Sequence, residues 1–174
     1  RQLGFTVVSL NNQDEMEQLQ PSFTNVIFHP VTRDAQADTE GLPLIYFDDL
    51  LAYLRTQGSQ ICGITHPDVC LHTDSQFLPF VRHQASHAMI FGSSLLDINL
   101  SNAQVALVAY SWGMDVCFFD KSWLNQFPSY AFCLGIPWSD HWLLLFALNQ
   151  GIPVKYFATP IAYFVKQQAN YSVD

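Results

Sequence analysis

The fold is decided by one stretch in the middle of the chain, Ile61-Cys-Gly-Ile-Thr-His66-Pro67-Asp68. Its largely apolar first part predicts a short buried strand. Pro67 has no N–H to donate to a sheet, so the strand is expected to end before it. Asp68 then stands just beyond the carboxyl end of the strand, which is where open α/β sheets bind their ligands. A carboxylate at this place can bind a divalent cation; the alternative is that Asp68 only caps a turn.

Outward from this stretch, strand patterns alternate with helix patterns. Short β-branched or aromatic runs predict further strands, and amphipathic segments between them predict helices. The predicted strands include 5–10, 25–28, 88–91 and 115–119, and the predicted helices include 13–19, 74–87 and 139–148. This alternation predicts an α/β three-layer sandwich with a mostly parallel central sheet. Because the sequence has no repeat, linker or low-complexity segment, residues 1–174 are expected to form one domain.

The composition excludes several classes of protein. Only 13% of the residues are charged and 49% are hydrophobic, so a disordered chain and a coiled coil are excluded. The net charge of -8 argues against nucleic acid as a partner, because such binding depends on neutralising phosphates. No apolar run is long enough to predict a transmembrane segment. Low charge with 14% aromatic residues instead predicts a protein partner, or a missing N-terminal segment, at an exposed sheet edge near the N-terminus.

The cysteines indicate a reducing environment. Cys62, Cys70, Cys117 and Cys133 lie in or beside apolar runs, and none forms a C-x-x-C pair. Four buried free thiols are therefore expected, which favours a cytoplasmic protein over a disulfide framework.

A second candidate site lies in the last third of the chain, Trp138-Ser-Asp140-His-Trp142. Gly135 and Pro137 predict a loop before it, and the apolar residues after it predict a helix. Asp140 at such a helix start could act as a general base for a hydroxyl group, and Trp138 and Trp142 could stack on a sugar ring. The alternative is a helix-capping aspartate beside two core tryptophans.

The order of these pieces resembles the inverting glycosyltransferases of the GT-A fold. DVCFFDKSWLNQF (115–127) resembles the strand and short helix that precede the family's catalytic loop. Residues 132–145 resemble that loop and its acidic helix start, and 149–157 with 160–164 resemble the last strands. In the first half, residues 5–10 would be the second strand of the nucleotide-binding part, so the family's first strand and helix are expected upstream of residue 1.

The resemblance implies an enzyme that transfers a sugar from a nucleotide-diphosphate sugar to an acceptor hydroxyl group. Asp140 would be the catalytic base. Asp68 matches the last aspartate of the metal-binding D-x-D motif and, with His66, would hold Mn or Mg and contact the donor. Asn11 is included among the donor contacts, and Trp138 and Trp142 are expected to contact the acceptor.

Two departures from the family pattern keep other functions open. His66 stands in place of the first aspartate of D-x-D, and Phe164 stands where the family often has a metal-binding histidine. They favour, as an alternative, a catalytically inactive GT-A-like module that binds a ligand or serves as a scaffold. A third possibility is an unrelated α/β enzyme, in which Asp68 and Asp140 would lie far apart or at opposite ends of the sheet.

Overall fold

The protein is a mixed α/β structure. The computed structural model describes residues 3–33, 35–42, 44–71, 73–96, 108–109, 114–129, 132–136, 139–157 and 161–164. They belong to two compact units, which are described separately: unit 1 comprises Arg1–Gln60 and Lys121–Ser139, and unit 2 comprises Ile61–Asp120 and Asp140–Asp174.

The elements follow the expected alternation closely. The helices are α1 (Gln13–Leu19), α2 (Phe47–Thr56), α3 (Phe77–Ala85), α4 (Ser139–Asn149) and the 3₁₀ helix η1 (Lys121–Gln126). The strands are β1 (Val8–Asn11), β2 (Ile27–Pro30), β3 (Ile61–Thr65), β4 (Val69–Leu71), β5 (Met89–Gly92), β6 (Ser94–Leu96), β7 (Val108–Ala109), β8 (Val116–Asp120), β9 (Val154–Tyr156) and β10 (Ala162–Phe164).

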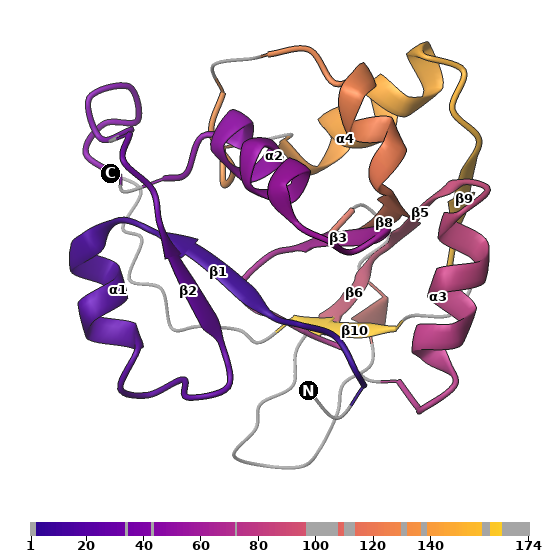
Figure 1. Cartoon of the computed structure of the whole chain (residues 1–174), viewed down its shortest axis with the longest axis horizontal. Coiled ribbons are helices and arrows are strands. Elements are labelled where there is room, and N and C mark those ends of the chain that lie inside the picture. Colours follow the sequence, from indigo (N-terminus) through magenta and orange to yellow (C-terminus); the bar gives the residue numbers. More distant parts are fainter. Residues whose placement is uncertain are drawn as a thin grey trace. The chain divides into compact units, whose positions relative to one another are not determined.

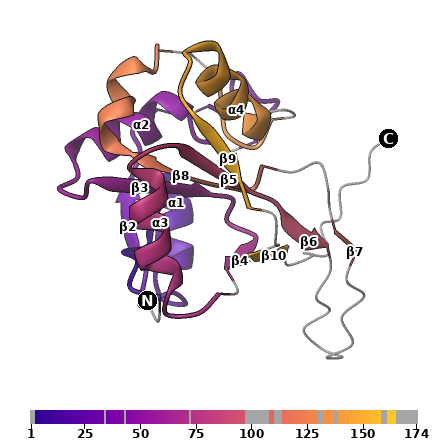
Figure 2. The ribbon, with the colours of Figure 1, turned by 90° about the vertical axis from the view of Figure 1, so that its right-hand side faces the viewer.

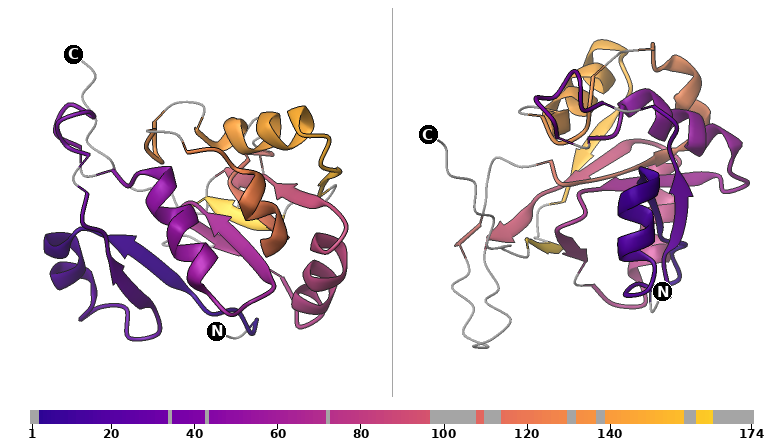
Figure 3. Two further views of the ribbon diagram at one scale, coloured as in Figure 1. Left: turned by 45° about the horizontal axis from the view of Figure 1, so that its top comes forward. Right: turned by 90° about the vertical axis from the view of Figure 1, so that its left-hand side faces the viewer.

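Unit 1 begins with a strand–helix–strand segment. β1 and β2 pair in parallel, and α1 connects them and lies beside them (Figure 3, left). The helix starts where its sequence predicts, because the Asn12 side chain accepts a hydrogen bond of 2.8 Å from the N–H of Glu15. Val7, Phe23 and Ile27 of this segment are exposed.

The second half of unit 1 joins α2 to η1. Arg55 donates to the carbonyl of Leu124 at 2.9 Å, which ties the last turn of the helix to η1. At the other end of α2 the fully buried ring of Phe47 stacks on Phe132, with 5.1 Å between centroids. Trp123 in η1 is half-buried.

Unit 2 contains a four-stranded sheet in the order β3-β8-β5-β9 (Figure 1). β8 runs antiparallel to both of its neighbours, and β5 and β9 are parallel. α3 packs against β5 and β8, and α4 lies on the opposite side of the sheet (Figure 2). Pro79 is accommodated in the first turn of α3, where its missing N–H costs no hydrogen bond.

A second four-stranded sheet in unit 2 has the order β4-β10-β6-β7. β10 pairs antiparallel with β4 and parallel with β6, and β6 pairs antiparallel with β7. β4 and β6 have three residues each and carry too little pattern to be predicted from the sequence.

The expectation of a mostly parallel central sheet is wrong for the described strands, because both four-stranded sheets are mixed. The chain leaves β5 at Gly92 and enters β8 at Val116, and these two residues are paired. A connection that returns to the edge it left must reverse the strand direction. The sequence pattern indicated parallel strands because every residue of β5 and β8 is buried. Such burial gives the continuous apolar runs that are typical of parallel strands.

Three of the four cysteines are buried, and one is exposed. Cys62, Cys117 and Cys133 are buried free thiols as predicted, but Cys70 is exposed. The reason is its place in the three-residue strand β4, where side chains alternate between the two sides.

Within the described residues, none of the helices has both the length and the apolar character needed to cross a bilayer.

Candidate functional site

The candidate site lies at one edge of the β3-β8-β5-β9 sheet in unit 2. Val116, the first residue of β8, pairs with Thr65 at the end of β3 and with Gly92 at the end of β5. The carboxyl ends of β3 and β5 therefore meet the start of β8. Segments that follow β3 and precede β8 are brought together there, although about 45 residues separate them along the chain.

The segment after β3 forms a tight turn around Asp68. The N–H of Val69 donates to the carbonyl of His66 at 3.2 Å, and Pro67 and Asp68 occupy the turn between β3 and β4. The N–H of His66 donates to the carbonyl of Asp115 at 3.2 Å, which continues the β3–β8 pairing by one residue. Asp68 is thus held beside the residue that precedes β8.

One oxygen of the half-buried Asp68 carboxyl group lacks a hydrogen bond among the described residues. This atom, Oδ1, is also inaccessible to solvent. Burial raises the pKa of Asp68 above its ordinary value, and the nearby Asp115 carboxylate acts in the same direction. Its own backbone N–H and the neighbouring His66 oppose this rise only in part. A buried carboxylate oxygen without a donor is a place where a cation or a ligand N–H or O–H would be stabilised.

Asp140 reaches the same edge from the first turn of α4. Its Oδ2 accepts a hydrogen bond of 3.1 Å from the N–H of Met114, the residue before Asp115. Its Oδ1 lies 2.9 Å from Nδ1 of His141. Burial acts to raise the pKa of Asp140, but the hydrogen bonds from Met114 and His141 outweigh it and hold the pKa below its ordinary value. Asp140 is therefore an ionised carboxylate at neutral pH.

We call the set His66, Asp68, Asp115 and Asp140 the acidic edge. Its members are connected through the backbone: His66 bonds to Asp115, and Asp140 bonds to Met114, which is adjacent to Asp115. Asp68 and Asp140 thus lie at the same end of the sheet, and not at opposite ends. The pKa of Asp68 is raised and the pKa of Asp140 is lowered, so the two carboxylates suit different roles. Asp68 gains more from a proton or a cation that neutralises its charge, whereas Asp140 stays ionised.

The sequence predicts a Mn or Mg site at Asp68 and His66. No group of three His, Cys, Asp or Glu side chains that could hold a metal ion is found within the described residues. A Mg²⁺ or Mn²⁺ ion could still be bound if Asp68, through its unpaired Oδ1, supplied one ligand and substrate phosphates and water supplied the rest, which is a usual arrangement for Mg²⁺.

Of the other predicted site residues, Trp142 belongs to unit 2 but does not face the acidic edge. Trp142 is half-buried and stacks on Phe146, with 5.3 Å between ring centroids. It follows Asp140 by two positions on α4, so the two side chains point to different sides of the helix. Asn11 belongs to unit 1, where its side chain bonds to Ser9 at 2.6 Å and to Glu15 at 3.4 Å. Trp138 lies outside the described residues.

Two members of the site environment were missed from the sequence. Asp115 opens the apolar run of β8, and His141 directly follows Asp140. The sequence signal for Asp115 was a carboxylate at a strand boundary. It indicates a site residue only once β8 is known to pair antiparallel with β3. Comparison with known proteins adds no identity to this geometry: no protein-family model matches the chain, and no curated protein matches it significantly.

Proposed function

We propose that this protein is an inverting glycosyltransferase that moves a sugar from a nucleotide-diphosphate donor to an acceptor hydroxyl group. The observation that carries the proposal is that Asp68 and Asp140 lie at the same end of the unit 2 sheet. In such a reaction one carboxylate can hold a cation that offsets the charge of the leaving diphosphate, and another can accept the proton of the acceptor hydroxyl group. The same observation argues against an unrelated α/β enzyme with the two carboxylates at opposite ends.

In this proposal Asp140 is the proton acceptor. The acceptor oxygen attacks the anomeric carbon, the bond from that carbon to the diphosphate oxygen breaks, and the bond's electron pair leaves with the diphosphate. The proton of the attacking hydroxyl group passes to a carboxylate oxygen of Asp140. Its hydrogen bonds to Met114 and His141 fix the position of that carboxylate and keep it ionised before the reaction.

Asp68 and His66 would contact the donor diphosphate. A divalent ion bound with the donor would offset the charge of the leaving diphosphate. The unpaired Oδ1 of Asp68 supports this role, because a carboxylate oxygen without a donor is available to a cation. The GT-A sandwich, with α3 and α4 on opposite sides of the unit 2 sheet, remains part of the same proposal.

The test separates binding from transfer. Calorimetry of the chain with a panel of nucleotide-diphosphate sugars and Mn²⁺ is expected to give binding that Asp68→Ala abolishes and Asp140→Asn retains. Transfer or hydrolysis of the bound sugar, followed by release of nucleoside diphosphate, should fall by about 10²- to 10⁴-fold in Asp140→Asn. Absence of binding by every donor, or full transfer by Asp140→Asn, would contradict the proposal.

A second candidate is a catalytically inactive binding module with the same edge. It is favoured by the fact that both oxygens of Asp140 already accept hydrogen bonds and by the lowered pKa, which makes this carboxylate a weaker base. This candidate predicts donor binding without release of nucleoside diphosphate, and equal affinity in the wild-type chain and Asp140→Asn.

A further inference from the structure

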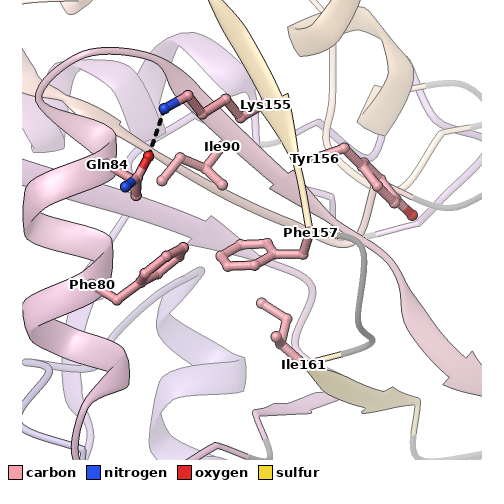
Figure 4. A pocket seen from close by; sticks show the side chains of 7 residues that line it. All are labelled: Phe80, Gln84, Ile90, Lys155, Tyr156, Phe157 and Ile161. Carbon is pink, nitrogen blue, oxygen red and sulfur yellow. Dashed lines mark hydrogen bonds between the residues drawn. The ribbon is translucent and has the colours of Figure 1, made fainter.

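A pocket separate from the acidic carboxylates lies between α3 and the β5–β9 pair of unit 2 (Figure 4). It has a volume of about 280 Å³, near the lower limit for small-molecule sites. Its lining comes from both elements and is mainly apolar: Phe80, Gln84, Ile90, Lys155, Tyr156, Phe157 and Ile161.

Two walls of this pocket are aromatic. The rings of Phe80 and Phe157 lie next to each other, tilted by 42°, with 5.9 Å between centroids, and the neighbouring Ile90 is almost fully buried (Figure 4). Gly92 allows this closure, because a Cβ atom there would lie 3.1 Å from the Phe157 ring and 3.3 Å from Ile161. Phe80 is 47% exposed, so one wall of the pocket is an aromatic ring open to solvent.

Lys155 is the only basic residue in the lining, and its hydrogen-bond partner is a neutral amide. The ammonium group of Lys155 donates to the amide oxygen of Gln84 at 2.6 Å (Figure 4). In the described part of the chain it forms no ion pair with a carboxylate, although acidic residues outnumber Lys and Arg by 15 to 7. A carboxylate would be a better partner than a neutral amide, because its opposite charge adds a Coulombic attraction to the hydrogen bond.

We propose that this pocket binds a small arylalkanoate, that is, one aromatic ring joined by a short chain to one carboxylate. The ring packs against Phe80, Phe157 and Ile90. The carboxylate replaces the Gln84 amide as the partner of Lys155. A neutral ligand of the same shape gains the apolar contacts but leaves Lys155 paired with Gln84, so the pocket distinguishes the two by charge.

The test is an amide ¹H–¹⁵N NMR titration of the whole chain with 3-phenylpropanoate and, separately, with 3-phenylpropan-1-ol. Shifts confined to the pocket residues are expected, with the acid binding about three- to fivefold more tightly than the alcohol. Lys155→Gln removes the cation, and Gln84→Glu gives Lys155 a carboxylate of its own. Both variants are expected to bind the acid and the alcohol equally.

Arg82→Gln is the matched control. Arg82 is exposed on the same helix and does not line the pocket, so this variant loses one positive charge but should keep the preference for the acid. The proposal is overturned if the alcohol binds the wild-type chain as tightly as the acid, or if Lys155→Gln keeps the preference. It is equally overturned if neither compound shifts the pocket amides at about 10 mM.

Discussion

Replacement of Gly63 by alanine tests the strand register that creates the acidic edge. Gly63 pairs with Phe118 across β3 and β8, and the same register brings Thr65 to Val116 and His66 to Asp115. A Cβ atom at Gly63 would lie 2.8 Å from two carbons of the Phe118 ring. That ring is 4% exposed and packs edge-on against Phe77 at 5.7 Å, so it has little room to move.

The expected effect is a balance of two opposing terms. Overpacking of this kind costs about 1–3 kcal/mol, whereas alanine in place of glycine restricts the unfolded chain and stabilises by about 0.4–1 kcal/mol. The steric term is larger, so Gly63→Ala is expected to lower the free energy of unfolding by about 1–2 kcal/mol. In urea denaturation followed by tryptophan fluorescence, this corresponds to a midpoint about 0.5–1 M lower.

Gly58→Ala is the matched control, because a Cβ atom at Gly58 would have no atom within 4 Å. This variant should leave the midpoint unchanged or raise it slightly. The register would be refuted if Gly63→Ala were as stable as Gly58→Ala, since the Phe118 ring could not then lie over Gly63.

Three further outcomes follow from contacts already described. Asp140→Asn should lower the free energy of unfolding by about 1–2 kcal/mol at pH 7. Because the pKa of Asp140 is lowered in the fold, the wild-type chain should lose this stability below about pH 4. Unfolding free energies measured against pH should show a smaller loss for the variant. The pKa of Asp68 is raised in the fold, so its charge destabilises at neutral pH: Asp68→Asn should unfold at higher urea than the wild-type chain at pH 7, and a lower midpoint would show that the carboxylate has a stabilising partner. Asn12→Ala should cost about 1 kcal/mol in thermal unfolding through loss of the α1 cap, whereas the exposed Asn25→Ala should cost nothing measurable.

Local patterns in the sequence predicted most elements correctly, because each depends on nearby residues. The pattern of residues 13–19 predicted α1, and Pro67 predicted the end of β3. Strand direction could not be predicted in the same way. A fully buried strand such as β8 has the same apolar pattern whether it runs parallel or antiparallel to its neighbours.

The candidate site was predictable only in part for the same reason. Asp68 and Asp140 were identified from their places at a strand end and a helix start. The role of Asp115 depends on the reversal of β8, and the Met114–Asp140 hydrogen bond depends on a backbone N–H, which carries no residue-type signal. Trp142 was expected at the acceptor because of its proximity in sequence, yet helical geometry turns it away from Asp140.

The most direct test of the central claim is paramagnetic NMR with Mn²⁺ and a nucleotide-diphosphate sugar. If Asp68 and Asp140 serve one site, Mn²⁺ added with the bound donor should broaden the amide signals of 66–69, 114–115 and 140–141 together, and Asp68→Ala should abolish this broadening. Broadening at 66–69 without any at 140–141, or broadening that survives in Asp68→Ala, would contradict a shared site at the acidic edge.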